Sequence, residues 1–379
     1  MARDEHEAED ALDDGTEIFR GVADLLLRRR ATPGSGGLDP ELEAAQKRLE
    51  GYYREHLESV PALRLLAELA QLRGDREAAR TFIGRAEALD PWNLEILIIS
   101  ESIHESARPG AGGIPLAAEG EPQTVDPEKI MERAMSFFRL GELERAYSLA
   151  RLAYLLAPAQ GFLLLDVWAV GAALDPKRAL QDLTRLHEQV GDAPYLLLAI
   201  GSVCNVMGLY PEAVAWLERG LRPTEDPFVA AMLLNELSYV EAKIGHHLER
   251  CVQMARHALE IFPNPAANGF IRDTLGVAYL KKGDLEKALA NLREAVAKDP
   301  TAIPRFHLAL ALLAQQDAPG ALSELRIIAA ARPSLECPHV EEMAILERVQ
   351  RVLPKLDELL NLGGPENIAA ARELLDGLV

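Results

Sequence analysis

Apolar positions recur every three or four residues along most of the chain, and short turn signals separate the runs. In residues 269–302, GFIRDTLGVAYLKKGDLEKALANLREAVAKDPTA, this spacing appears on both sides of Gly283-Asp284. The pattern predicts two amphipathic helices joined by a tight turn, and Pro300 marks the end of the second helix. Alternation with a period of two is rare elsewhere in the chain. We therefore predict an all-α protein.

Small residues occupy one position on each of these two helices. Gly276 lies on the first and Ala288 on the second, while Tyr279 and Leu292 are large residues beside them. Small residues let two antiparallel helices cross closely, and the larger ones fill the space on either side. This spacing resembles a tetratricopeptide repeat (TPR), a 34-residue helical hairpin.

The same pattern returns along the chain at intervals of 33 to 38 residues. The unit at 160 lacks the turn glycine, the unit at 231 needs one extra residue in its turn, and the unit at 94 has only a first helix. A single hairpin of this kind buries only one face, so neighbouring copies must cover the other. The expected first positions of the repeats are 60, 94, 127, 160, 194, 231, 269 and 302.

The resemblance, which runs from Val60 to Leu335, implies an α-solenoid. We expect a right-handed superhelix of antiparallel helix pairs, with helical caps at both ends because the end of an open array has no neighbour. We expect five segments: an acidic tail and first helix (1–37), a cap helix with the first repeat and a half repeat (38–106), a Gly/Pro-rich loop (107–125), the main array (126–335) and C-terminal capping helices (336–379).

The charge of the chain narrows its possible partners. The net charge is −19, from 59 acidic and 40 basic residues. Nucleic acids and anionic membranes attract basic surfaces, so we expect neither as a partner. The first 17 residues, MARDEHEAEDALDDGTE, are strongly acidic. They are either a frayed, solubilising tail or an arm that meets a basic partner.

The cysteines and the apolar runs indicate the cellular compartment of the protein. The chain has 3 cysteines, Cys204, Cys251 and Cys337, which are too few and too scattered for a disulfide framework. No secretory signal is visible at the N-terminus, and no run of 18 apolar residues predicts a membrane span. We expect a cytoplasmic protein.

One cluster contains residue types that bind metals. His246, His247, Cys251 and His257 lie close in sequence, and His247 and Cys251 are one helical turn apart. Cys251, however, falls where the repeat needs a small packed residue, and a structural zinc site needs four ligands. No phosphate-binding loop or nucleophile motif is present. We therefore expect no metal, no cofactor and no catalytic residue.

The resemblance also implies a binding surface. In the TPR family, the first helices of successive hairpins line a concave groove in which partners usually bind. Asn235 alone takes a place comparable to the cationic clamp of chaperone-binding members, so we do not expect a receptor for chaperone tails. The positions that carry over to the groove of this chain are Met131, Met135, Phe138, Leu164, Trp168, Tyr195, Leu198, Asn205, Asn235, Tyr239, Phe270, Asp273, Lys281 and Phe306.

Two questions stay open from the sequence. The groove is either open to a partner or filled by the chain's own segments, such as the loop 106–125 or the N-terminal helices. The protein is either an adaptor that holds a helical or extended segment of another protein, or an assembly subunit that acts through its outer face or ends as a homo-oligomer. A metal-binding or enzymatic role using His246, His247 and Cys251 is the third hypothesis.

Overall fold

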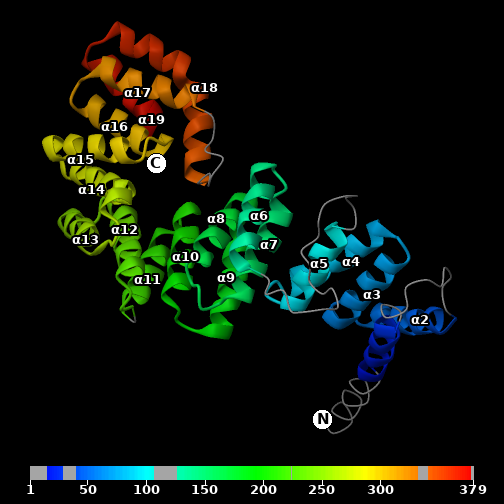
Figure 1. Ribbon diagram of the computed structural model, residues 1–379. Coiled ribbons are helices and arrows are strands. Elements are labelled where there is room, and N and C mark those ends of the chain that lie inside the picture. The colour runs from blue at the N-terminus through cyan, green and yellow to red at the C-terminus, as the bar shows by residue number, and fades with distance from the viewer. Residues whose placement is uncertain (1–14, 29–39, 106–125, 223, 332–339, 377–379) are drawn as a thin grey trace, which may run out of the picture. The chain divides into compact units, whose positions relative to one another are not determined.

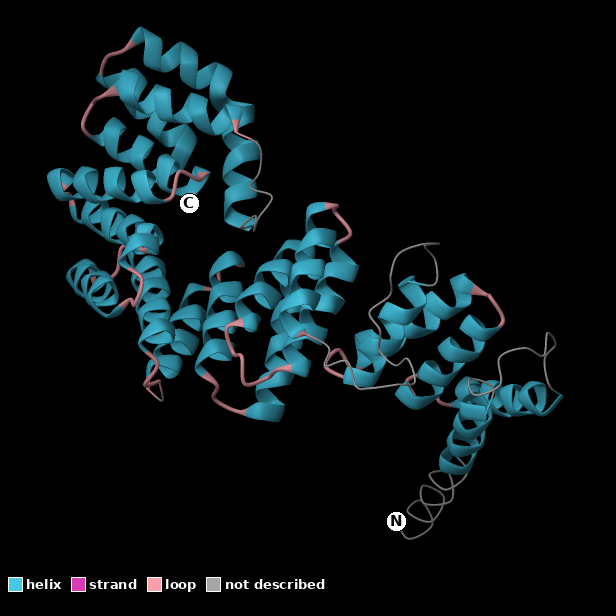
Figure 2. Ribbon diagram, in the orientation of Figure 1, coloured by secondary structure: helices cyan, strands magenta, loops and turns pink. Residues whose placement is uncertain are grey.

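The computed structural model describes residues 15–28, 40–105, 126–222, 224–331 and 340–376. All regular elements in these ranges are helices, which confirms the all-α prediction (Figure 2). A helix over 15–28 comes first. The helices after it are α2 (Pro40–Glu55), α3 (Val60–Leu72), α4 (Arg76–Leu89), α5 (Leu94–Glu105), α6 (Pro127–Arg139), α7 (Leu143–Leu156), α8 (Leu163–Leu174), α9 (Pro176–Val190), α10 (Pro194–Val206), α11 (Tyr210–Leu221), α12 (Pro227–Lys243), α13 (Leu248–Ile261), the 3-10 turn η1 (Pro265–Ala267), α14 (Gly269–Lys282), α15 (Leu285–Lys298), α16 (Ala302–Ala314), α17 (Ala318–Ala330), α18 (Val340–Leu362) and α19 (Pro365–Asp376).

These helices stack as consecutive pairs, which confirms the α-solenoid (Figure 1). Six of the eight expected repeat positions coincide with the start of a helix. The other two differ by a few residues: α8 begins at Leu163 instead of 160, and α12 at Pro227 instead of 231. Asp226 explains the earlier start of α12, since its side chain accepts a hydrogen bond from the Phe228 amide at 2.9 Å and caps the helix.

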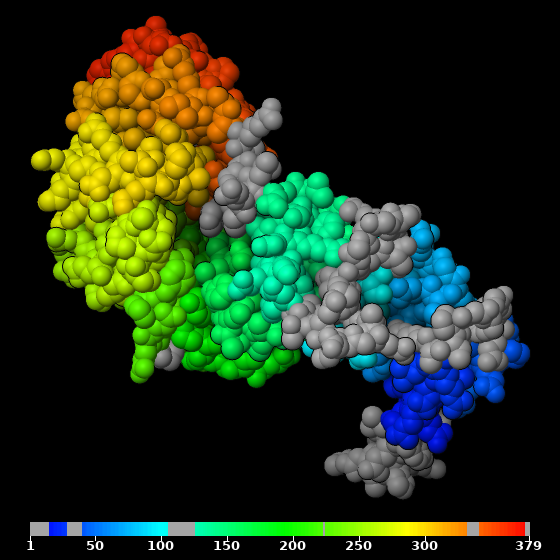
Figure 3. Space-filling model, in the orientation of Figure 1, coloured from blue at the N-terminus to red at the C-terminus, as the bar shows by residue number. Residues whose placement is uncertain are grey.

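The described residues form two compact units. Unit 1 comprises the chain up to Ala134 together with Ser148–Pro158, and unit 2 comprises Met135–Tyr147 together with the chain from Ala159 onward. The division runs through helices α6 and α7. In the space-filling view, the helix pairs from α12 to α17 in unit 2 form a continuous surface (Figure 3).

The turn between α14 and α15 shows how the sequence defines a hairpin. Gly283 has a φ of 86°, a left-handed conformation that glycine adopts without steric cost. Asp284 then accepts a hydrogen bond from the Lys287 amide at 3.3 Å and caps α15. Gly74 and Asp75 form the same pair of signals between α3 and α4. A Gly-Asp pair therefore ends one helix and starts the next.

Glycine is also required where the two helices of a hairpin cross. A Cβ atom added at Gly276 would lie 2.5 Å from Cγ of Leu292, closer than side-chain atoms can approach. Gly201 is equivalent in the hairpin of α10 and α11, where an added Cβ would lie 2.6 Å from Cγ of Leu217. Ala288 is fully buried in the same crossing as Gly276. The small residues of the repeat are therefore packing residues.

The irregular repeats are accommodated in their turns. Asp175 alone joins α8 to α9, and its side chain accepts hydrogen bonds from the amides of Lys177 and Arg178, so no turn glycine is needed. The turn between α12 and α13 contains the expected extra residue, with left-handed backbone at Gly245 and His247. The unit at 94, for which the sequence predicts only a first helix, has that helix as α5.

The expected caps correspond to helices at both ends of the described chain. The helix over 15–28 and α2 precede the first repeat, and α18 and α19 follow the last one. The acidic tail 1–14 and the loop 107–125 lie outside the described residues. None of the described helices combines the length and apolar character that a membrane crossing requires.

Candidate functional site: a cavity in unit 2

Side chains from successive first helices of unit 2 converge on one cavity of about 460 Å³. They come from α8, α10, α12 and α14, each of which contacts the next in this series. This is the face that the repeat pattern predicts for a groove, because the first helices of stacked hairpins lie side by side. The volume falls within the range of small-ligand pockets, roughly 300–1,000 Å³.

Half of the predicted groove residues line this cavity. They contribute aromatic, apolar and polar groups from all four first helices. These residues are Trp168, Leu198, Asn205, Asn235, Tyr239, Phe270 and Asp273.

The other seven predicted residues lie elsewhere. Leu164 and Phe306 are fully buried, so they pack in the core and do not face the groove. The remaining five do not line the cavity either, and their exposure varies from buried to exposed: Met131, Met135, Phe138, Tyr195 and Lys281. Met131 belongs to unit 1. The groove positions expected from the family therefore predict the cavity wall on α8, α10, α12 and α14, and not on the helices before or after them.

The apolar part of the wall is accessible from the cavity. Trp168 and Phe270 are both half-buried, and Met232 and Ile303 beside them are also only partly covered. Exposed aromatic and thioether side chains of this kind adapt to the shape of an apolar ligand. This part of the wall can hold an apolar side chain.

The polar part of the wall centres on Glu236. Asn205 donates a hydrogen bond from Nδ2 to Oε1 of Glu236 at 2.9 Å. Burial raises the pKa of Glu236, because removal from water disfavours the charged carboxylate. Hydrogen bonds from Asn205 and Ser202 and the charge of Lys243 oppose this effect only in part. No ion-pair partner lies beside Glu236 among the described residues. It is only partly covered because it faces the cavity.

Two amide oxygens in this wall lack hydrogen-bond partners. Oδ1 of Asn205 and Oδ1 of Asn235 are both buried and accept no hydrogen bond from any described group. The two residues are only 7% and 8% exposed. Buried polar groups are nearly always paired in folded proteins, so two unpaired oxygens at one cavity indicate that something else supplies the donors.

The chain itself closes one side of the cavity with the first turn of α18. Glu341 accepts a hydrogen bond from the Tyr239 hydroxyl at 2.8 Å and forms an ion pair with Lys243 at 3.4 Å. Glu342 accepts a hydrogen bond from the Ala302 amide at 3.2 Å, at the start of α16. The sequence predicted two segments that might fill the groove, and neither was α18, which it assigned to the terminal cap.

Asp273 is paired with a buried histidine. Nδ1 of His307 lies 2.8 Å from the Asp273 carboxylate, and both residues are at least 96% buried. Burial opposes the charged imidazolium, but the adjacent carboxylate outweighs this effect, so the pKa of His307 is raised. His307 therefore compensates the charge of Asp273 inside the protein.

The candidate metal ligands do not come together. Cys251 is fully buried and burial raises its pKa to about 12, so the thiol stays protonated. Its Sγ lies 3.3 Å from the carbonyl oxygen of His246, a backbone contact. The His247 ring is largely exposed, near Glu241. Within the described ranges, no group of three or more His, Cys, Asp or Glu side chains could hold a metal ion.

Sequence reasoning predicted Asp273 but missed the other acidic residues of the wall. Glu236 is the most informative omission, because it is a carboxylate inside the otherwise apolar stretch MLLNELSYV of α12. A charged residue in such a stretch is a signal that can be read from the sequence. Glu341 and Glu342 carry no such signal, since only the fold brings α18 to the groove.

Comparisons with known proteins agree with this architecture. Residues 274–336 match a family model described as tetratricopeptide repeat. A search of curated proteins found no match. The match to 274–336 covers α15, α16 and α17 and part of α14.

Several solved structures are similar in fold. One is a chain of the Cut9–Hcn1 hetero-tetramer of APC/C, with 16% identity and a TM-score of 0.43 over 82% of this chain and 59% of that chain. This chain thus spans less than two thirds of that protein. Another is PilW, described as a type IV pilus biogenesis factor, with 15% identity and a TM-score of 0.42 over 61% of this chain and 100% of that one.

A third is a tetratricopeptide repeat protein from Parabacteroides merdae, with 14% identity and a TM-score of 0.40 over 67% of this chain and 99% of that one. These similarities are distant, and none of them bears on what this chain binds. Residues 274–336 match the tetratricopeptide repeat family, and the stacked helix pairs of the described chain have the hairpin architecture of such repeats.

Proposed function

We propose that this protein is a non-enzymatic adaptor that holds a segment of a partner protein in the cavity of unit 2. The observation that carries the proposal is the convergence of α8, α10, α12 and α14 on one cavity with both apolar and polar walls. A repeat scaffold of this kind commonly uses its concave face for a ligand. The segment is either helical or extended.

The wall chemistry supports a peptide ligand. Trp168 and Phe270 offer partly exposed aromatic surface, which commonly carries most of the binding energy of an interface. The amides of Asn205 and Asn235 lie beside them and have unpaired oxygens. Apolar anchors with nearby hydrogen-bonding groups are what a peptide needs, since it presents side chains and a polar backbone together.

We also propose a cytoplasmic location. Cys204 and Cys251, the two cysteines within the described ranges, are free and buried. Unpaired thiols are typical of reducing compartments. Cell fractionation with an antibody to the chain tests this proposal, and recovery outside the cytoplasmic fraction would contradict it.

Partner capture tests the adaptor proposal. A double variant, Trp168→Ala with Phe270→Ala, removes the aromatic wall while leaving the hairpin crossings untouched. We expect at least about a tenfold loss of the co-purified partner, the effect of losing a single strong anchor. Circular dichroism should show unchanged helicity.

A matched control removes two apolar side chains outside the cavity. Leu140 and Val190 are 68% and 52% exposed in unit 2, and neither lines the cavity. The Leu140→Ala with Val190→Ala variant should recover the partner as well as the wild type does. Equal recovery with the cavity variant and the wild type would contradict the proposal.

A further inference from the structure

The wall of the cavity in unit 2 is strongly acidic. Five lining residues carry carboxylates, and no described residue that lines the cavity is basic. They are Glu236, Asp273, Asp299, Glu341 and Glu342. A low-dielectric cavity lined by one sign of charge attracts a ligand of the opposite sign. An acidic peptide, by contrast, would be repelled.

Most of these carboxylates already have a partner. His307 compensates Asp273, and Lys243 compensates Glu341. Glu342 caps the start of α16, where the helix dipole favours a negative charge. Asp299 accepts a hydrogen bond from the Thr301 amide at 3.2 Å, beside the partly exposed edge of the cavity.

Glu236 is different, because its hydrogen bonds come from the neutral side chains of Asn205 and Ser202, and no described cation forms an ion pair with it. Burial raises the pKa of Glu236 and the charge of Glu341 adds to this, while Lys243, which is already paired with Glu341, opposes it. A buried carboxylate without a cationic partner is costly to the fold. A cationic ligand would remove that cost on binding.

The unpaired amides supply the second observation. Asn205 and Asn235 line the same cavity, are more than nine-tenths buried, and each has an oxygen without a donor. The wall therefore combines one carboxylate that has no ion-pair partner among the described residues with two unused acceptors. A ligand that satisfies all three must bring several N–H donors and a positive charge.

A guanidinium group meets this requirement better than an ammonium group. It carries five N–H donors in a planar fork, against three on a lysine, and it stays charged at every physiological pH. Its flat faces also stack on aromatic rings, and Trp168, Tyr239 and Phe270 all line the cavity. Arginine is thus the side chain that matches both parts of the wall.

We propose that the cavity of unit 2 is a receptor for an arginine side chain on the partner segment, with Glu236 as its counter-ion and Asn205 and Asn235 as additional acceptors. This inference rests on the proposed adaptor function and names the chemistry of the partner. The segment is apolar beside its arginine, because Trp168, Met232 and Phe270 continue the wall.

The test uses the full chain and two small probes, N-acetyl-argininamide and N-acetyl-citrullinamide. The two have nearly the same shape, but the citrulline side chain has no charge. Ligand-observed NMR titrations should show saturable binding of the arginine probe that is about tenfold or more tighter than that of the citrulline probe, as expected for a charge-assisted contact. N-acetyl-lysinamide should fall between them.

The Glu236→Gln variant should lose this preference, so that the two probes bind it equally. Glu286→Gln is the matched control, since Glu286 is an exposed carboxylate on α15 that does not line the cavity. It should keep the wild-type preference. The comparison of the two probes on wild-type protein does not depend on the folding of any variant.

Equal binding of both probes to the wild type, or no saturable binding of the arginine probe, would overturn the inference. So would an undiminished preference in the Glu236→Gln variant. None of these results would contradict the adaptor proposal. That proposal is tested separately, by the recovery of the partner with the Trp168→Ala and Phe270→Ala double variant. The two failures are therefore distinguishable.

Discussion

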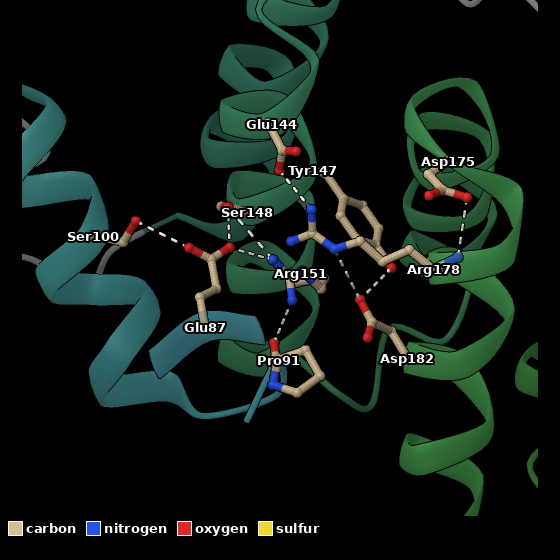
Figure 4. A network of polar contacts seen from close by, with 10 residues as sticks. All are labelled: Glu87, Pro91, Ser100, Glu144, Tyr147, Ser148, Arg151, Asp175, Arg178 and Asp182. Carbon is tan, nitrogen blue, oxygen red and sulfur yellow. Dashed lines mark hydrogen bonds and ion pairs between the residues drawn. The ribbon is translucent and has the colours of Figure 1, made fainter. Parts of the chain in front are cut away.

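Two charged side chains inside the protein, Arg151 in unit 1 and Glu236 in unit 2, differ in the partners that surround them. In unit 1, Arg151 is fully buried and its Nη1 donates to the Pro91 carbonyl at 2.7 Å (Figure 4). Its Nη2 pairs with Glu87, which also accepts hydrogen bonds from Ser100 and Ser148. In unit 2, Glu236 faces the cavity and accepts hydrogen bonds only from the neutral side chains of Asn205 and Ser202 among the described residues.

This difference separates a structural network from a binding surface. The fold pairs both Nη atoms of Arg151 and the carboxylate of Glu87 with complementary groups. At Glu236 the fold leaves acceptors without donors beside a cavity. Groups that a protein leaves unsatisfied are the ones that a ligand can satisfy.

Removal of Arg151 should have the largest effect on stability. Arg151→Ala leaves Glu87 buried beside two serines with no cation, which costs about 3–5 kcal/mol of unfolding free energy. Urea denaturation followed by circular dichroism measures the loss. Arg326→Ala is the control, because Arg326 and its partner Asp357 are both exposed and such pairs contribute about 0–1 kcal/mol. Losses of equal size would show that the buried pair is not special.

Glycines inside helices give a second contrast between the units. Gly276→Ala in unit 2 forces a Cβ against Leu292, and overpacking of this kind costs about 1–3 kcal/mol. Gly84 in unit 1 is exposed within α4, and an added Cβ would meet nothing within 4 Å. Gly84→Ala should therefore stabilise by about 0.5–1 kcal/mol through helix propensity. Thermal unfolding of the two variants should move in opposite directions.

Glu236→Gln should stabilise unit 2, the reverse of what charge removal does in unit 1. Burial raises the pKa of Glu236 above its unfolded value of about 4.3, so the ionised carboxylate disfavours the folded state. The gain, about 0.5–2 kcal/mol, should be largest at neutral pH and should vanish as the pH falls toward about 4. Destabilisation at neutral pH would mean that the fold already compensates Glu236.

His307 should give the smallest effect, visible only as a pH dependence. Its raised pKa means that the imidazolium, held by Asp273, stabilises the fold fully below about pH 6.5 and loses this contribution as the pH rises through the folded pKa. Glu341 and Lys243 also act on it, in opposite directions. The urea concentration at the unfolding midpoint should therefore decrease more between about pH 6 and about pH 9 in the wild type than in the His307→Gln variant. Parallel curves would contradict the pairing.

Much of the fold could be predicted from the sequence. The Gly-Asp turns, the small residues at the crossings and the proline stops are local signals, and a hairpin repeats them at a fixed interval. Even the extra residue in the turn before α13 was predictable, because the positions after it return to register. The start of α12 was misplaced, because Asp226 and Pro227 define a helix start outside the repeat pattern.

The site was only partly predictable. Trp168, Asn205, Asn235 and Phe270 followed from the periodicity, because residues on one face of stacked first helices meet in space. Leu164 and Phe306 have the same spacing but face the core, since small rotations of a helix about its axis change which neighbours a side chain meets. Repeat position alone does not fix that rotation.

The sequence by itself determined the helices, their pairing and the face on which the first helices meet, because turn chemistry and helical periodicity act over a few residues. Only the tertiary structure decided that the first turn of α18 closes the cavity. Glu342 bonds to Ala302, 40 residues earlier in the chain, and Glu341 to Tyr239, 102 residues earlier. The tertiary structure also decided which buried charges find partners. Contacts between segments so distant in sequence depend on the rotation and displacement that every hairpin between them adds to the array. A local sequence pattern does not determine the total.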